Sequence, residues 1–283
     1  MKNRAILHKL SIFALAVLIF IFASFCLMSC GNKTQKEYID YTKDNNFEIE
    51  HTSFVANPKA NEEDQYGAEI YCPKDNNPKY GLIFYVGTMT PTNKYTYLCN
   101  SLVKAGFLVV IPKVSFNMTY GYYSEQTEVI STKILNDYPD VEFFIGGHSQ
   151  GGGAAMRFST ENQNKIKGAI FLAPLCYNDL DTDDTIFGLA NSNLPALLLQ
   201  ASGDCVLSAS DRSDAEARMP QNVTYYLISP GAHMSFSEWD DNATLEFFLG
   251  DGEGITEEGK AIQKEKTINY IFEFIYRVIG IEK

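Results

Sequence analysis

A single serine, Ser149, stands after an apolar run and between glycines, in the sequence Gly147-His148-Ser149-Gln150-Gly151. The pentapeptide fits the pattern G-x-S-x-G, in which a tight, strained turn between a buried strand and a helix lifts the serine hydroxyl above a sheet edge. Glycines beside the serine remove the Cβ atoms that would clash in such a turn. The sequence therefore predicts that Ser149 is a nucleophile. The alternative is a glycine-rich turn that serves packing or binds phosphate.

A serine hydroxyl is a poor nucleophile at neutral pH and needs an adjacent base. The chain has four histidines. His8 lies in the apolar N-terminal segment, His51 falls in an early predicted strand, and His148 is part of the serine turn itself. His233, in the sequence SPGAHMSF, follows a predicted strand near the C-terminus. By elimination and by chain order, His233 is the predicted base.

The base in turn needs an acid that fixes its tautomer and stabilises its charge. Asp204, in QASGDCV, directly follows the predicted strand 195–202 and should lie at the same sheet edge as Ser149. Asp179, after the preceding strand, is the alternative. Three neighbouring acids are interpreted as a solvated loop, with a cation site as the less favoured reading: Asp181, Asp183 and Asp184. The order serine, aspartate, histidine is that of α/β-hydrolases, not of the trypsin or subtilisin classes.

Acyl transfer also requires donors for the oxyanion. The backbone N–H of Gln150, at the start of the helix after Ser149, is one predicted donor. The second should come from the turn after the apolar run 81–86. We assign it to the backbone N–H of Thr88, with Met89 as the alternative.

The elements that must position these residues alternate between strand and helix from Gly81 onward. Continuous apolar runs indicate strands that are covered on both faces. The pattern predicts an α/β fold, with a mostly parallel sheet and helices on both faces. Predicted strands cover 47–55, 66–72, 81–86, 107–112, 141–146, 167–174, 195–202 and 222–229. Predicted helices cover 93–105, 124–137, 150–160, 209–218 and 256–279.

The N-terminus has a different character from the rest of the chain. A basic start is followed by the nearly uniformly apolar stretch 10–27 and by Cys30, which is the pattern of a bacterial lipoprotein signal. We predict a signal peptide over 1–29, lipidation at Cys30 with a flexible spacer over 30–45, and a hydrolase domain over 46–283. The alternative is an uncleaved membrane anchor. Either interpretation places the domain outside the cytoplasm, tethered to a membrane.

Charge and cysteine content limit the possible partners and covalent links. The formal net charge of −12 argues against nucleic acid, which requires clustered basic residues. Outside the cytoplasm an even number of cysteines permits disulfides, although four buried thiols are equally compatible with the sequence. These cysteines are Cys72, Cys99, Cys176 and Cys205.

From about residue 66 onward the chain resembles the α/β-hydrolase superfamily, and more narrowly the group called α/β-hydrolase fold 5. The resemblance rests on segments 83–113, 146–155 (GGHSQGGGAA), 202–206 (SGDCV), 230–236 (PGAHMSF) and 251–274. It implies a hydrolase with a triad of Ser149, Asp204 and His233.

The predicted function is a membrane-tethered, extracytoplasmic serine hydrolase that cleaves a small-molecule carboxylic ester and requires no metal or organic cofactor. Segment 176–194 is too short for a full cap domain, so we expect an open site. Four aromatic residues are candidates for an acyl pocket: Phe116, Tyr120, Tyr122 and Tyr123. Two alternatives remain open. One is a non-catalytic ligand-binding lipoprotein on the same fold. The other is an acyltransferase or thioesterase that uses the same triad.

Overall fold

The computed structural model describes residues 46–119, 124–176, 187–239, 251 and 255–281. The chain divides into two compact units, Met1–Ile39 and Asp40–Lys283, and every described residue belongs to the second. The predicted signal peptide, Cys30 and the spacer lie outside the described residues. None of the described helices is long and apolar enough to cross a membrane.

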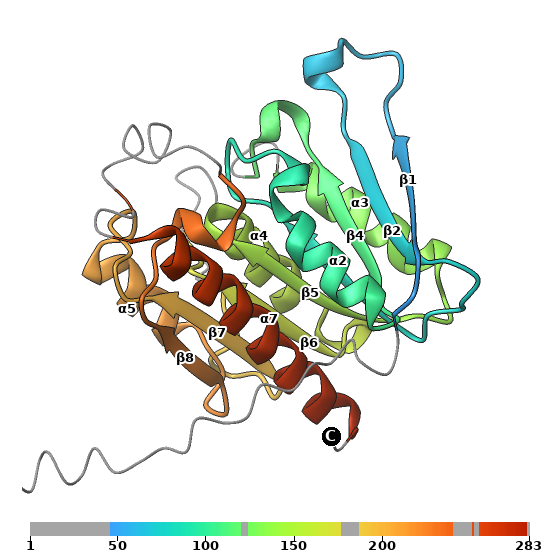
Figure 1. The fold of residues 1–283 in the computed structure, drawn as a ribbon. Helices are drawn as coiled ribbons and strands as arrows, with labels where there is room; N and C mark the ends of the chain where they lie inside the picture. The colour runs from blue at the N-terminus through green and yellow to red at the C-terminus, as the bar shows by residue number, and fades with distance from the viewer. Residues whose placement is uncertain (1–45, 120–123, 177–186, 240–250, 252–254, 282–283) are drawn as a thin grey trace, which may run out of the picture. The chain divides into compact units, whose positions relative to one another are not determined.

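Eight strands form one sheet in the order β1-β2-β4-β3-β5-β6-β7-β8 (Figure 1). β1 and β2 pair antiparallel, as do β2 and β4, and all other neighbours are parallel. The mostly parallel sheet predicted from the alternating pattern is thus confirmed. The strands are β1 Ile49–Val55, β2 Gly67–Pro73, β3 Tyr80–Tyr85, β4 Leu108–Lys113, β5 Glu142–His148, β6 Gly168–Leu172, β7 Ala196–Ala201 and β8 Thr224–Ile228.

The chain reverses its direction across the sheet at β3. It passes from β3 to β4 on one side and then returns to place β5 on the other side of β3. At the carboxyl ends of β3 and β5, Tyr85 pairs with Gly147. Ligands of open parallel sheets bind at such a switch point, outside the carboxyl ends of the strands. The turn that follows β3 and the turn that follows β5 therefore meet where a binding site is expected.

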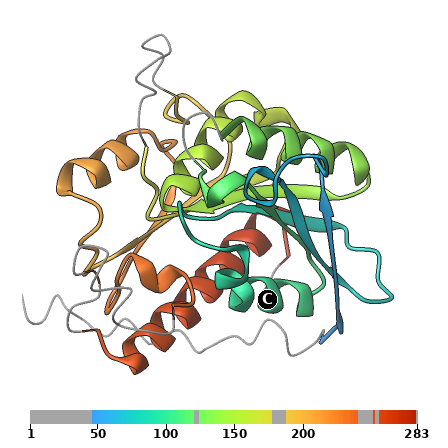
Figure 2. The ribbon, with the colours of Figure 1, turned by 90° about the horizontal axis from the view of Figure 1, so that it is seen from above.

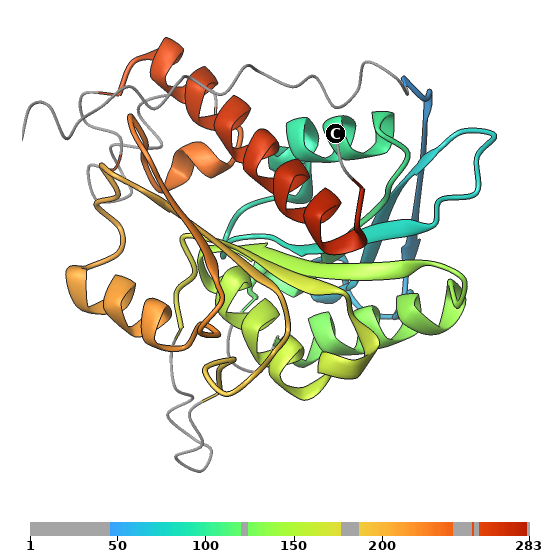
Figure 3. The ribbon, with the colours of Figure 1, turned by 90° about the horizontal axis from the view of Figure 1, so that it is seen from below.

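Helices cover both faces of the sheet (Figures 2 and 3). α2 and α7 lie on one face, and α3, α4 and α5 lie on the other. Their bounds are α2 Thr96–Lys104, α3 Ser124–Asp137, α4 Ser149–Glu161, α5 Ala209–Ala217 and α7 Glu257–Ile279. The hydroxyl of Thr256 caps the start of α7, and Gly280 ends it in a left-handed conformation with φ of 74°.

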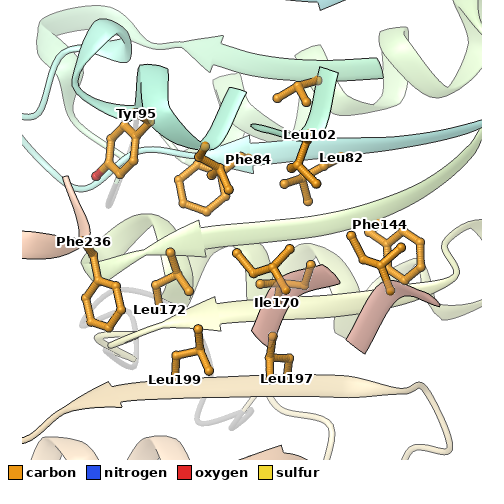
Figure 4. Packing of buried hydrophobic residues seen from close by; sticks show 14 of the residues in the cluster. Leu82, Phe84, Tyr95, Leu102, Phe144, Ile170, Leu172, Leu197, Leu199 and Phe236 are labelled. Atoms are coloured by element: carbon orange, nitrogen blue, oxygen red, sulfur yellow. The ribbon is translucent and has the colours of Figure 1, made fainter. Parts of the chain in front are cut away.

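The two faces of β3 explain its uninterrupted apolar run. Leu82 and Phe84 pack with the α2 and α7 side, whereas Ile83 and Tyr85 pack with the α3 and α4 side. All four side chains are fully buried. Figure 4 shows the first of these clusters, with Tyr95 and Phe236 at the end nearest the carboxyl ends of the strands. A well-packed sheet of this kind provides a rigid base for the turns above it.

Candidate active site

Ser149 occupies the turn between β5 and α4 with a left-handed backbone, at φ of 54°. A residue with a side chain pays about 1–3 kcal/mol for such a conformation, which persists only where the surrounding structure enforces it. The side chain is half-buried. The strained strand-to-helix turn that the G-x-S-x-G pattern predicts is therefore present at Ser149.

Two glycines of the pentapeptide allow the helix to sit this close to the sheet. A Cβ atom added to Gly151 would lie 2.1 Å from the carbonyl oxygen of Val86, in the segment after β3. A Cβ atom on Gly147 would lie 2.3 Å from the carbonyl oxygen of Gly151. Contacts this short are sterically forbidden, so both positions require glycine for close approach. The conformation of Ser149 thus depends on direct backbone packing between α4, β3 and β5.

Asp204 and His233 form a buried pair. The Nδ1 atom of His233 lies 2.8 Å from Oδ2 of Asp204, and both side chains are only 1% exposed. The two residues follow β7 and β8, which are parallel neighbours, so their turns meet at one sheet edge. An aspartate acceptor at Nδ1 requires the proton there, which leaves Nε2 as the basic nitrogen. The structure therefore brings together the predicted acid and the predicted base.

The second oxygen of Asp204 is also satisfied. Oδ1 accepts hydrogen bonds from the backbone N–H groups of Val206 at 2.9 Å and Leu207 at 2.8 Å. Burial by itself raises the pKa of Asp204, but the hydrogen bond and charge of His233 and the two N–H donors outweigh it and lower the pKa overall. Asp204 is consequently ionised near neutral pH.

The turn that carries His233 is held by backbone contacts on two sides. The N–H of Gly203 donates to the carbonyl of Gly231 at 2.7 Å, which ties the acid turn to the base turn. From α7, the fully buried side chain of Gln263 accepts from the N–H of Ala232 at 2.8 Å and donates to its carbonyl at 2.9 Å. Since Ala232 precedes His233, α7 fixes the backbone from which the imidazole projects.

His233 lies next to His148, the residue before the serine. The rings of His148 and His233 have centroids 4.7 Å apart. Among the contacts of the described residues there is no direct hydrogen bond between Ser149 and His233. Such bonds are often long in the absence of substrate and shorten when it binds. The predicted base therefore lies beside the serine turn, and the serine hydroxyl forms no hydrogen bond with another described group.

The turn after β3 contacts the serine turn directly. The hydroxyl of Thr88 donates a hydrogen bond to the side-chain oxygen of Gln150. The backbone N–H of Met89 donates to the carbonyl of Asn117 at 2.8 Å and is therefore occupied. The N–H of Thr88 has no such partner among the described residues, and the first N–H groups of α4, including that of Gln150, have no partner within the helix. Of the two alternatives for the second oxyanion donor, the geometry favours Thr88.

Other predicted residues fall outside this arrangement. Asp179, Tyr120, Tyr122 and Tyr123 lie outside the described residues, as do the acids of 181–184. Phe116 has a left-handed backbone with φ of 55° and is 46% exposed.

All four cysteines of the described part are free thiols, with Cys99 and Cys176 buried and Cys205 exposed. In the described segments, no cluster of three or more histidine, cysteine or acidic side chains could hold a metal ion.

Sequence reasoning missed several buried residues that support the site. His148 and its partner Tyr95 lie under the serine turn, Gln263 projects from α7, and Asp251 contacts the base turn. Of these residues, Gln263 has a signal in the sequence, because it is a polar residue among the buried residues of α7. A polar residue in such a place indicates a buried polar contact. The contacts of the other three join segments far apart in the chain.

The sheet, its switch point and the strained serine turn together define an α/β hydrolase fold. A family model described as "Alpha/beta hydrolase family" matches residues 81–244, which is more than half of the chain. The chain therefore belongs to the alpha/beta hydrolase family. No curated protein matches it significantly.

Proposed function

We propose that the protein is a serine hydrolase that cleaves carboxylic esters. The observation that carries this proposal is the buried 2.8 Å pair of Asp204 and His233, placed at the same sheet edge as the left-handed Ser149. A buried, oriented imidazole and a strained serine turn are costly to maintain, and their joint presence is explained by nucleophilic catalysis.

In the proposed reaction, the Ser149 hydroxyl oxygen attacks the ester carbonyl while Nε2 of His233 takes the hydroxyl proton. Asp204 holds the imidazole and stabilises its positive charge without becoming protonated. The N–H groups of Gln150 and Thr88 donate to the oxyanion of the tetrahedral intermediate. His233 then protonates the leaving alcohol. Water hydrolyses the acyl-enzyme by the same steps in reverse order, giving acid and regenerated Ser149.

We also propose that the protein is a lipoprotein held at the outer side of a bacterial cell membrane through Cys30. The support is the basic and apolar N-terminal segment that ends at this cysteine. Metabolic labelling with a tagged fatty acid, followed by fractionation, tests this. Wild type should carry the label and Cys30→Ala should not. Wild type that is found in the membrane fraction without label would favour the uncleaved anchor.

The enzymatic proposal is tested by a fluorophosphonate probe and by turnover of p-nitrophenyl esters, using the full chain in detergent. Wild type should be labelled and active, and Ser149→Ala should be neither. Ser159→Ala is the matched control, because Ser159 is buried in the same helix α4 and should retain both properties.

Two results would contradict the proposal. Labelling that survives in Ser149→Ala would mean that another serine is the nucleophile. A folded wild type that neither labels nor hydrolyses any ester of the series would favour a ligand-binding protein on the hydrolase fold. An ester series that varies the acyl and alcohol parts separately defines the ester preference. Turnover of a thioester tests thioesterase activity. Formation of a new ester with an added alcohol tests acyl transfer.

A further inference from the structure

Asp251 is a buried carboxylate with an unusual set of partners. It is 2% exposed. Oδ1 accepts from the backbone N–H of Cys205 at 3.2 Å and from that of His233 at 3.0 Å, and Oδ2 accepts from the N–H of Met234 at 2.7 Å. Both carboxylate oxygens thus accept hydrogen bonds from backbone donors, and among the hydrogen bonds of the described residues none joins Asp251 to the imidazole of His233.

These three bonds connect the two turns on which the acid and the base stand. Cys205 directly follows Asp204, and Met234 directly follows His233. A single carboxylate therefore fixes the backbone next to both members of the pair. Hydrogen bonds from N–H groups to a charged acceptor are shorter and roughly twice as strong as neutral ones. In a buried position, loss of the acceptor leaves three N–H groups without a partner.

The function of this connection follows from what catalysis requires. A displacement of about 1 Å in a catalytic group can reduce the rate about 100-fold, even when its cause lies outside the reacting atoms. The Nδ1 to Oδ2 contact of 2.8 Å leaves little tolerance for relative movement of the two turns. Gly203 and Gly231 connect the same turns on another side.

We propose that Asp251 is a positioning residue for the His233–Asp204 pair, acting through the backbone of both turns. This inference rests on the proposed function, since it assigns Asp251 a role only in supporting that pair. Asp251 binds backbone N–H groups of the two turns and not the side chains that react, so its removal should lower kcat and leave KM nearly unchanged.

Two variants of the full chain in detergent separate positioning from folding. Asp251→Asn keeps the shape and one carbonyl acceptor, which can still serve Cys205 and His233, but places an NH2 group against the N–H of Met234. Asp251→Ala removes every acceptor. We expect kcat to fall about 10-fold in the first variant and about 100-fold in the second, with KM within about 3-fold of wild type.

A control variant should lose stability without affecting the pair. Ile134→Ala removes a fully buried side chain from α3, on the sheet face opposite α7. It should lower the melting temperature while keeping kcat near the wild-type value. Melting curves of all variants confirm that each is folded at the assay temperature. If the Asp251 variants lose no more kcat than this control at a similar loss of stability, the proposal is overturned.

A spectroscopic measurement reports on the pair independently of turnover. The proton on Nδ1 of His233, bonded to Asp204, should give a downfield proton resonance in wild type and in Ile134→Ala. The resonance should be broadened or lost in Asp251→Ala. An unchanged resonance together with unchanged kcat would overturn the proposal for Asp251. A wild type that shows the resonance but no labelling or turnover would overturn the proposed function instead.

Discussion

The hydroxyl oxygen of Tyr95 lies 2.8 Å from Nδ1 of His148, the residue immediately before Ser149. The same hydroxyl accepts a hydrogen bond from the backbone N–H of Gly87 at 2.9 Å. The tautomer of His148 determines which of the two groups donates in this hydrogen bond. This buried contact joins the turn after β3, which carries Thr88, to the strand end that carries the serine.

Removal of the Tyr95 hydroxyl should destabilise the protein and impair the proposed oxyanion site. In Tyr95→Phe the N–H of Gly87 and Nδ1 of His148 both lose a partner in a buried place. We expect the free energy of unfolding to fall by about 1–3 kcal/mol, with a loss of kcat. Urea unfolding and ester turnover measure the two effects. Tyr270→Phe, half-buried on α7, should change stability by less than about 0.5 kcal/mol. Equal effects of the two variants would contradict this role of Tyr95.

His148 should make stability depend on pH. Burial, and secondarily the nearby His233, hold the pKa of His148 well below its usual value of 6.5. Below pH 6.5 the unfolded chain binds a proton at His148, whereas the folded protein keeps this residue neutral. The contribution of neutral His148 is therefore complete above pH 6.5 and is progressively lost as the pH falls from there toward the folded pKa.

The test compares urea unfolding of wild type and His148→Gln between about pH 7.5 and about pH 5. The variant should be less stable at the upper pH, because the contact with Tyr95 changes, but its free energy of unfolding should fall less steeply as the pH decreases. Ser159→Ala, which removes a buried side chain that does not titrate, provides the control and should keep the wild-type slope. Parallel curves for wild type and His148→Gln would refute the prediction.

Replacement of Asp204 by asparagine should remove most of the activity. An asparagine NH2 group that donates to Nδ1 of His233 would place the imidazole proton on Nε2, where the base is needed. We expect kcat to fall by roughly 1,000-fold or more. Asp137→Asn, on the exposed surface of α3, is the matched control and should retain full turnover. Retained activity in Asp204→Asn would return Asp179 to consideration as the acid.

Gly151→Ala tests the close packing of α4 on β3. Its Cβ atom, 2.1 Å from the oxygen of Val86, would force the helix start away from the strand and displace Ser149 and Gln150. Labelling by the fluorophosphonate probe should become undetectable, and the melting temperature should fall. Glu161→Ala, at the exposed end of the same helix, should label like wild type. Normal labelling of Gly151→Ala would mean that the serine turn does not depend on this contact.

Residue patterns predicted most of the fold because each element obeys a local rule. The predicted helices over 124–137 and 256–279 agree with α3 and α7. The strand predicted over 141–146 extends to His148 in the structure. Gly146 and Gly147 still pair through their backbones with β3 and β6, which a pattern of apolar side chains does not show.

The site was predictable only where chain order and strand ends determine position. That reasoning placed Asp204 and His233 together, and it placed Ser149 in a strained turn. It missed Tyr95, His148 and Asp251, because the hydrogen bonds of Asp251 span 17 to 46 positions of the chain and the one between Tyr95 and His148 spans 53. The order of strands in the sheet, with β3 between β4 and β5, likewise arises from tertiary packing and has no local signal.

The two hydrogen bonds between Gln263 and the backbone of Ala232 have a consequence for the order in which the proposed site can form during synthesis. Ser149, Asp204 and His233 all precede α7 in the chain. Synthesis runs from the N-terminus, so a growing chain contains the proposed nucleophile, acid and base before it contains the helix that holds the turn of His233 in place. A nascent or C-terminally shortened protein would carry every reacting group and remain without its last support. The helix α7, which is made after these residues, thus completes the proposed site.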